Sequence, residues 1–278
     1  MRRSTTFAAT DRRRTSIGAL LVTELICALL LVGRPQADQP HPVVAAPASL
    51  TTPTAAATTQ TLDDGRTVHL VGLGGARTAP LLARIGAEMN DASKAVSAFW
   101  GPAWPRDVLI VAAGTDAEFG ALAAGGPDIA ATTTAERIMF APGAAHMSDA
   151  SLRIVVRHEL FHFASRARTA GDAPRWLTEG VADFVGRPPQ ARPANAEQLA
   201  QLPTDAELSD PGPAGSRAYD RAWWFTRFVA DAYGTDALQA LYIRACAPGH
   251  PDAATAVRDT LGADLPTVLV RWRHWMSG

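Results

Sequence analysis

The chain has 278 residues, of which 47% are apolar and 19% charged, and it contains seven Trp and nine Phe. This composition excludes a disordered tail, a collagen-like fibre and a coiled coil, and the chain is long enough to bury a sizeable core. Lys and Arg number 26 against 27 Asp and Glu, so the net charge of −1 gives no reason to expect a nucleic-acid partner.

Residues 1–37 are predicted to form a signal peptide or an uncleaved signal anchor. Several arginines precede an apolar run over residues 17–33, whose length is at the lower limit for crossing a bilayer. Glu24 interrupts this run and no good cleavage site follows closely, so both alternatives stay open, with a twin-arginine signal at 12–14 as a weaker third. In each case we expect the body outside the cytoplasmic membrane, secreted or anchored to its outer face, with membrane contact only through this segment.

Residues 38–60 are rich in Pro, Ala and Thr and are predicted to be a flexible linker to a body over residues 61–278. The first half of the body alternates between patterns typical of strands and of helices. In chain order these are a strand over 67–73, a helix over 78–100, a buried strand over 107–112, a short helix over 116–123, and strands over 129–133 and 137–140, either as a hairpin or as two edge strands.

From residue 148 onward every predicted element is a helix, over 148–166, 174–185, 216–233, 236–246, 253–261 and 265–275. Strands first and helices later predict an α+β fold. A small mixed sheet lobe over 61–147 is expected to pack on the helix over 148–166, and a helical lobe completes residues 148–278. Trp223, Trp224, Trp272 and Trp275 are expected in the core of the helical lobe. Cys246 is the only cysteine of the body, and we expect it to be a small buried side chain without a disulfide.

A glycine-rich turn, Gly72-Leu73-Gly74-Gly75, joins the first predicted strand to the first helix and superficially resembles a dinucleotide-binding loop. That fingerprint requires a third glycine where this chain has Arg77, and Asp91 falls inside the predicted helix instead of at a strand end. We therefore predict a plain strand-to-helix turn.

The residues that indicate chemistry are His-Glu-Leu-Phe-His at 158–162, the pattern H-E-x-x-H within a predicted helix. Residues four apart lie on one face of a helix, so His158 and His162 can bind a single tetrahedral metal ion. Glu159 is expected to point beside the metal, where the general base for a metal-activated water must lie. The pattern predicts one Zn²⁺ per chain.

A third ligand, Glu179, is predicted on the next helix, from which the chain can bring its carboxylate to the same ion. Two His and one Glu with an open fourth position are typical of catalytic zinc rather than structural zinc. Gly180 is expected to let the two helices approach closely. Asp183, one turn beyond Glu179, is expected to orient a ligand histidine through its other ring nitrogen, the alternative being a solvated helix face.

The H-E-L-F-H segment together with Pro-Arg-Trp-Leu-Thr-Glu-Gly-Val-Ala-Asp-Phe at 174–184 resembles the gluzincin metallopeptidases, particularly the small bacterial peptidase MA-like group with a thermolysin-like catalytic core. The resemblance covers residues 105–245. It implies a minimal gluzincin fold and a peptide or protein substrate bound in extended form by an edge strand near 137–140. The chain has no G-x-M-E-N-like element, so an endopeptidase is implied rather than an aminopeptidase that binds a free N-terminus.

Tyr219 is the predicted hydrogen-bond donor to the oxyanion formed in peptide hydrolysis. The chain has three tyrosines, and the settings of Tyr233 and Tyr242 look structural. In the gluzincins that the chain resembles, a tyrosine or histidine from a later helix has this role. The alternative is that Tyr219 packs on the surface of the lobe, in which case His146, otherwise read as a loop histidine, or an arginine is the next candidate.

The resulting hypothesis is an exported zinc-dependent peptidase in which Glu159 takes a proton from zinc-bound water and passes it to the leaving amine. The alternative is a non-peptidase zinc-binding envelope module that keeps the gluzincin fold. Intact Glu159 favours the enzyme, because a module without hydrolysis needs no carboxylate beside the metal. A purely structural zinc is disfavoured, because only three protein ligands are apparent.

Overall fold

A computed structural model describes residues 56–123, 129–193 and 196–278. The predicted signal segment 1–37 and residues 38–55 of the predicted linker lie outside the described residues. Residues 56–60 were also predicted as linker, and this was wrong, because they form most of strand β1 (Ala56–Thr61). Its Ala and Thr run lacks hydrophobic alternation because β1 is an edge strand whose side chains stay largely exposed.

The sheet has five strands in the order β1-β2-β3-β5-β4, where β2 is Thr67–Gly72, β3 is Asp107–Ala112, β4 is Ala131–Thr133 and β5 is Ile138–Phe140. Strands β2, β3 and β5 are parallel, whereas β1 and β4 run antiparallel to their neighbours, so the sheet is mixed as predicted. The apolar run Asp-Val-Leu-Ile-Val-Ala forms β3, which is paired on both sides and is buried except for the exposed Asp107 and the half-buried Leu109.

Strands β4 and β5 form a hairpin, one of the two predicted arrangements, whose turn is closed by a 2.8 Å hydrogen bond from Thr134 N to Arg137 O. The prediction that residues 137–140 form an edge strand was wrong. Because the hairpin folds back outward, β5 pairs with both β3 and β4, and β4 lies at the edge of the sheet.

Helices cover both faces of the sheet. On β3, Ile110 belongs to the large core shared with α2 (Ala79–Trp100), whereas Val111 packs with Phe119 of α3 (Asp116–Ala123) on the opposite face. The glycine-rich turn leads through a short 3₁₀ turn into α2, and Asp91 lies within that helix, in agreement with the sequence.

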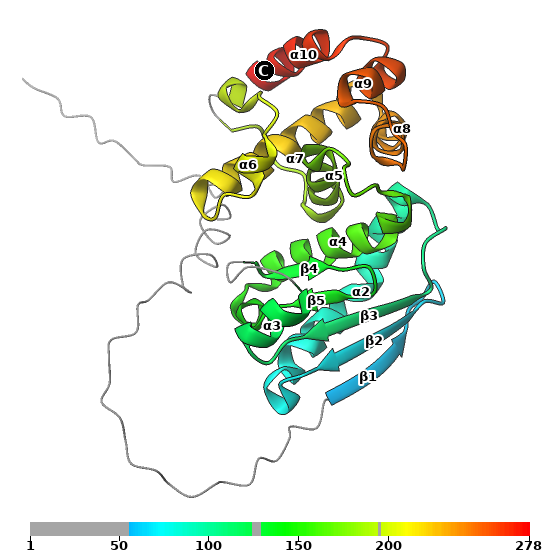
Figure 1. Cartoon of the computed structure of the whole chain (residues 1–278), viewed down its shortest axis with the longest axis vertical. Helices are drawn as coiled ribbons and strands as arrows, with labels where there is room; N and C mark the ends of the chain where they lie inside the picture. Colours follow the sequence, from blue (N-terminus) through cyan, green and yellow to red (C-terminus); the bar gives the residue numbers. More distant parts are fainter. Residues whose placement is uncertain (1–55, 124–128, 194–195) are drawn as a thin grey trace, which may run out of the picture.

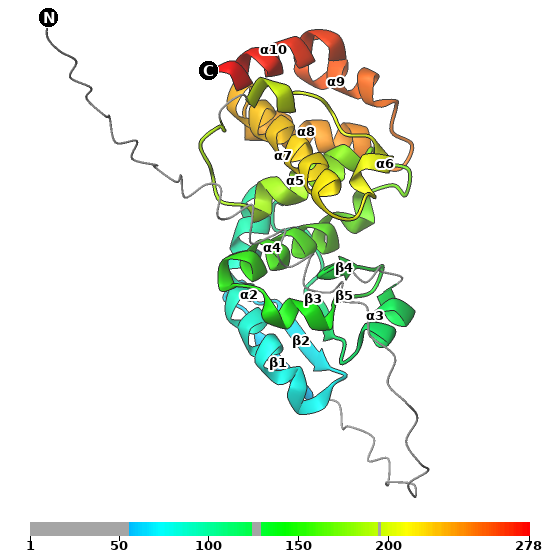
Figure 2. The same ribbon diagram turned by 90° about the vertical axis from the view of Figure 1, so that its left-hand side faces the viewer.

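Helix α4 (Asp149–Ser165) begins where Ser148 caps it by accepting a hydrogen bond from Ser151 N. It lies between the sheet lobe (β1–β5 with α2 and α3) and the helical lobe (α5–α10), as Figures 1 and 2 show. The helical lobe contains α5 (Arg175–Gly186), α6 (Asp205–Leu208), α7 (Pro213–Tyr233), α8 (Thr235–Cys246), α9 (Ala253–Leu261) and α10 (Leu265–Ser277). The fold is therefore α+β.

The core of the helical lobe agrees with its apolar sequence pattern. Trp223, Trp224 and Trp272 are buried, and Trp275 packs half-buried against them. Cys246 is fully buried on α8, and burial raises the pKa of its thiol to about 12. In the described part of the chain, no helix combines the length and the apolar character needed to cross a membrane.

Gly180 lies at a close contact, but with a different helix from the one predicted. A Cβ atom at position 180 would lie 2.7 Å from the carbonyl oxygen of Ala222 and 2.9 Å from Thr226 Cγ2, both on α7. The glycine that faces α4 is Gly186, where an added Cβ would lie 3.0 Å from Ile154 O. Glycines thus let α5 approach both α7 and α4.

We expect Gly180→Ala to lower the free energy of unfolding by about 1–3 kcal/mol, because the added methyl group overpacks the contact between α5 and α7. The measurement is urea or thermal denaturation of the purified protein. Gly143→Ala is the matched control, since a Cβ there would meet nothing within 4 Å. Equal stability of the two variants would contradict the close contact.

Candidate metal centre

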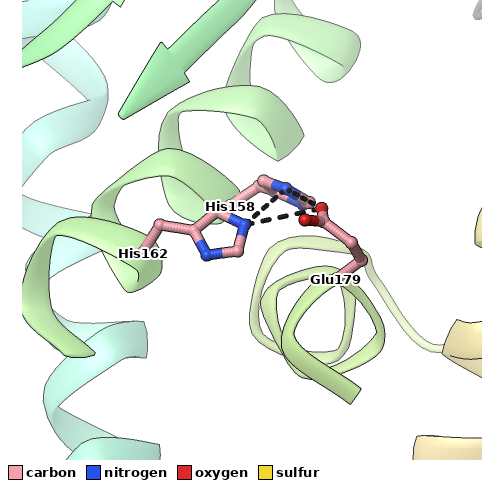
Figure 3. Close-up of side chains that lie close together, drawn as sticks. All are labelled: His158, His162 and Glu179. Carbon is pink, nitrogen blue, oxygen red and sulfur yellow. Dashed lines mark hydrogen bonds and ion pairs between the residues drawn. The ribbon is translucent and has the colours of Figure 1, made fainter. Parts of the chain in front are cut away.

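Three side chains from two helices converge on one point. His158 and His162 lie one turn apart on α4, and their Nε2 atoms are 3.1 Å from each other. Glu179 of α5 brings its Oε2 atom to 3.3 Å from His158 Nε2 and 3.5 Å from His162 Nε2, as Figure 3 shows. The structure thus brings together the three predicted ligands.

This arrangement fits a zinc ion. In a tetrahedral site with metal–ligand distances of about 2.0–2.2 Å, neighbouring ligand atoms lie about 3.3–3.5 Å apart. The three donor–donor distances of 3.1, 3.3 and 3.5 Å are close to that spacing. Imidazole nitrogens and a carboxylate oxygen are also the donor types that zinc prefers. His158, His162 and Glu179 would therefore hold the ion, with one coordination position left open.

The charges at this point also suit a cation. Burial alone would raise the pKa of Glu179, but the two histidines hold it well below the ordinary value, so the carboxylate is ionised at neutral pH. Burial alone would lower the pKa of His158, yet its hydrogen bonds to Asp183 and Glu179 raise it well above the ordinary value. A bound metal would take the place of the proton that this cluster attracts.

Asp183 lies behind the first histidine. Its Oδ1 atom is 2.9 Å from His158 Nδ1, and its side chain is almost fully buried, which excludes a solvated helix face. When neutral His158 carries its proton on Nδ1, that N–H donates a hydrogen bond to Asp183 and the Nε2 lone pair faces the centre of the site.

Arg187 extends this contact to a third helix, and the sequence analysis did not single it out. Its guanidinium lies 2.6 Å from Asp183 Oδ2 and 2.6 Å from Asp220 Oδ1 of α7. Because Asp183 is buried and Arg187 is largely buried, each charge needs the opposite charge of the other. The four-residue spacing of Asp183 and Arg187 is the sequence signal that could have predicted this ion pair, because residues four apart on a helix are neighbours.

Glu159 is buried next to the three ligands, and a residue of the edge strand contacts it. The hydroxyl of Thr133, the last residue of β4, lies 2.7 Å from Glu159 Oε2 and 2.9 Å from the Glu159 carbonyl oxygen. Thr133 was not predicted as a site residue, because a threonine in a short strand carries no signal of what lies opposite it.

A pocket of about 480 Å³ opens beside the ligands. Its walls are formed by residues 129–135, the second half of α4, the start of α5 and Tyr219 of α7. Burial, followed by the nearby charges of Glu179 and Asp183, raises the pKa of Tyr219. Its hydroxyl therefore stays protonated at neutral pH and is available as a donor. His146 is exposed and is not part of the pocket wall.

The chain has a distant likeness among known protein structures. No family model and no curated protein matches the sequence. Among solved structures, a two-domain M1 zinc metallopeptidase, determined as a mutant bound to L-arginine, is similar to 81% of this chain with 16% identity and a TM-score of 0.49. The match covers 52% of that protein, so the chain spans about half its length. A likeness this distant carries no weight for the site.

We expect the purified protein to bind one zinc ion, and His158→Ala, His162→Ala or Glu179→Ala each to reduce zinc occupancy, because each removes one of three convergent donors. Zinc content after dialysis against dilute chelator measures this. His146→Ala, which alters an exposed histidine outside the pocket, is the matched control. Full occupancy in all three ligand variants would overturn the site.

Proposed function

We propose that the protein is a zinc-dependent peptidase that hydrolyses peptide bonds within a chain, with Glu159 as the general base. The observation that carries this proposal is the position of the buried Glu159 carboxylate beside the donors His158, His162 and Glu179, in the wall of one pocket. A structural metal site has no need of an additional carboxylate in the wall of an adjoining pocket.

Glu159 is suited to moving a proton between water and the leaving group. It follows His158 on α4, so its carboxylate lies beside the metal ligands rather than among them. The Thr133 hydroxyl donates to one carboxylate oxygen, Oε2, which orients the group and leaves Oε1 available to accept a proton from the attacking water. Glu159 then delivers this proton to the amine that leaves.

Zinc, when bound, would supply Lewis acidity that polarises the scissile carbonyl and makes water a stronger nucleophile at neutral pH. Tyr219 reaches the same pocket from α7, on the side of the helical lobe. Its protonated hydroxyl would donate a hydrogen bond to the oxygen that becomes negatively charged as the carbonyl is attacked.

The edge strand β4 is suited to holding a peptide in extended form. It pairs with β5 on one side, and no strand of the described part of the chain pairs with its other side. Residues 131–133 also line the pocket beside Glu159. A substrate that hydrogen-bonds to this edge would pass directly in front of the metal ligands.

The second candidate, a zinc-binding envelope module without hydrolytic activity, would share the ligands and the fold. Incubating the purified protein with a peptide library, with and without chelator, separates the two candidates.

For either candidate function, we propose a location outside the cytoplasmic membrane, supported by the basic residues before the apolar run at 17–33.

We expect Glu159→Gln to retain zinc and to lose peptide hydrolysis by several orders of magnitude, because it removes the base and leaves the three ligands in place. Zinc content and turnover of a peptide cleaved by the unaltered protein are measured together. Turnover near that of the unaltered protein would place the base elsewhere.

We expect Tyr219→Phe to lower kcat by roughly ten- to a thousandfold with little change in KM, since it removes only the hydroxyl that meets the developing charge. Zinc content and thermal stability should match those of the unaltered protein. Tyr233→Phe is a suitable control, because that hydroxyl contacts Arg271 outside the pocket. Activity within about twofold of the unaltered protein would show that Tyr219 only packs in the pocket wall.

A further inference from the structure

Two arginines, Arg166 and Arg175, line the pocket from different elements. Arg166 directly follows α4, and its Nε donates to the carbonyl oxygen of Ala135, next to the β4–β5 turn, at 2.9 Å. Arg175 is the first residue of α5, and its Nη1 donates to Asp205 O at 3.2 Å and to Ser209 Oγ at 2.7 Å. One guanidinium is thus tied to the sheet lobe and the other to the helical lobe.

Neither arginine has a carboxylate partner within 4 Å among the residues that the structure describes. The bonds that hold them go to neutral acceptors, and Arg166 also stacks on the Phe163 ring, 3.5 Å from its centroid. Partial burial lowers the pKa of Arg166, the mark of a cation that has lost water without gaining an anion.

The carboxylates of the pocket wall are already engaged. Glu179 contacts His158 and His162, and Glu159 accepts the hydroxyl of Thr133. Among the residues that the structure describes, no acidic group in the lining is left to neutralise the two guanidiniums. Their remaining N–H groups therefore suit an anion brought by the substrate, and a fixed guanidinium binds a carboxylate particularly well because it can donate two parallel hydrogen bonds.

We propose that Arg166 and Arg175 select substrates that carry a carboxylate close to the scissile bond. This inference rests on the proposed peptidase function and adds the class of substrate. In a peptide, the carboxylate comes from an acidic side chain or from the free C-terminus, and both sources offer the same group to the guanidiniums.

The test uses the zinc-loaded full chain and alanine-rich peptides in which a single Glu is moved along the sequence, each paired with its Gln counterpart. Every peptide is made as a free acid and as a C-terminal amide, so that the two sources of carboxylate are separated. Peptide affinity is measured by calorimetry on the Glu159→Gln variant, and kcat/KM on the unaltered protein.

We expect at least one Glu position, or the free acid, to be preferred over its neutral counterpart by about ten- to a hundredfold in affinity. Arg166→Gln and Arg175→Gln should each reduce this preference, whereas Arg166→Lys and Arg175→Lys, which keep the charge and lose the planar fork, should retain part of it.

Arg168→Gln and Arg217→Gln are the matched controls. They remove the same charge from exposed positions that do not line the pocket, and they should leave the preference unchanged. Thermal denaturation and zinc content identify any variant that fails to fold, and the lysine variants then provide the comparison.

The inference would be overturned if the unaltered pocket bound Glu and Gln peptides equally well and also bound acid and amide ends equally well. It would also be overturned if none of these peptides bound measurably. A preference that survives in both glutamine variants would overturn it as well. Cleavage without any charge preference would reject this inference and keep the peptidase. A charge preference in binding with no cleavage of any peptide would reject the peptidase and keep the role of the arginines.

Discussion

The site depends on one buried contact, the hydrogen bond of 2.9 Å between His158 Nδ1 and Asp183 Oδ1. It joins α4 to α5, and the ion pairs of Arg187 with Asp183 and Asp220 extend it to α7. The buried charge of Asp183 and the largely buried charge of Arg187 are tolerated only while they remain paired, so the three helices are held in one arrangement. The same arrangement brings Glu179 to the histidines and places Tyr219, the neighbour of Asp220, in the pocket wall.

Close packing and charge pairing act together in this arrangement. Without side chains at Gly180 and Gly186, the backbone of α5 can lie against both α7 and α4. Thr226 Oγ1 further donates to Gly180 O at 2.9 Å, one residue from the Glu179 ligand. The third ligand is thus placed by contacts on both sides of its helix, which is how a preorganised metal site avoids a large ordering cost when the ion binds.

The two lobes contribute different residues to the site. The sheet lobe provides the edge strand β4 and the Thr133 hydroxyl that contacts Glu159, whereas the helical lobe provides Glu179 and Tyr219 and, behind His158, Asp183. Helix α4 lies between the two lobes (Figure 1) and contributes the ligands His158 and His162 as well as Glu159. Two guanidiniums, which have no acidic partner in the described part of the chain, add positive charge to this pocket, and the proposed preference for substrates that carry a carboxylate follows from that charge.

The sequence by itself determined the local features: the helix carrying H-E-x-x-H, the α+β order of the elements, and Glu179 and Asp183 as candidates one turn apart. These follow from side-chain periodicity and from spacing within single helices, which short stretches of chain encode. Only the tertiary structure decided which strand lies at the edge, that Thr133 meets Glu159, and that Arg166 and Arg175 share one pocket. Such pairings join residues far apart in the chain, and they depend on how the hairpin folds back and on how whole helices pack. Strand β1 was missed for the same reason, since its exposed Ala and Thr residues become a strand only because β2 offers them a partner.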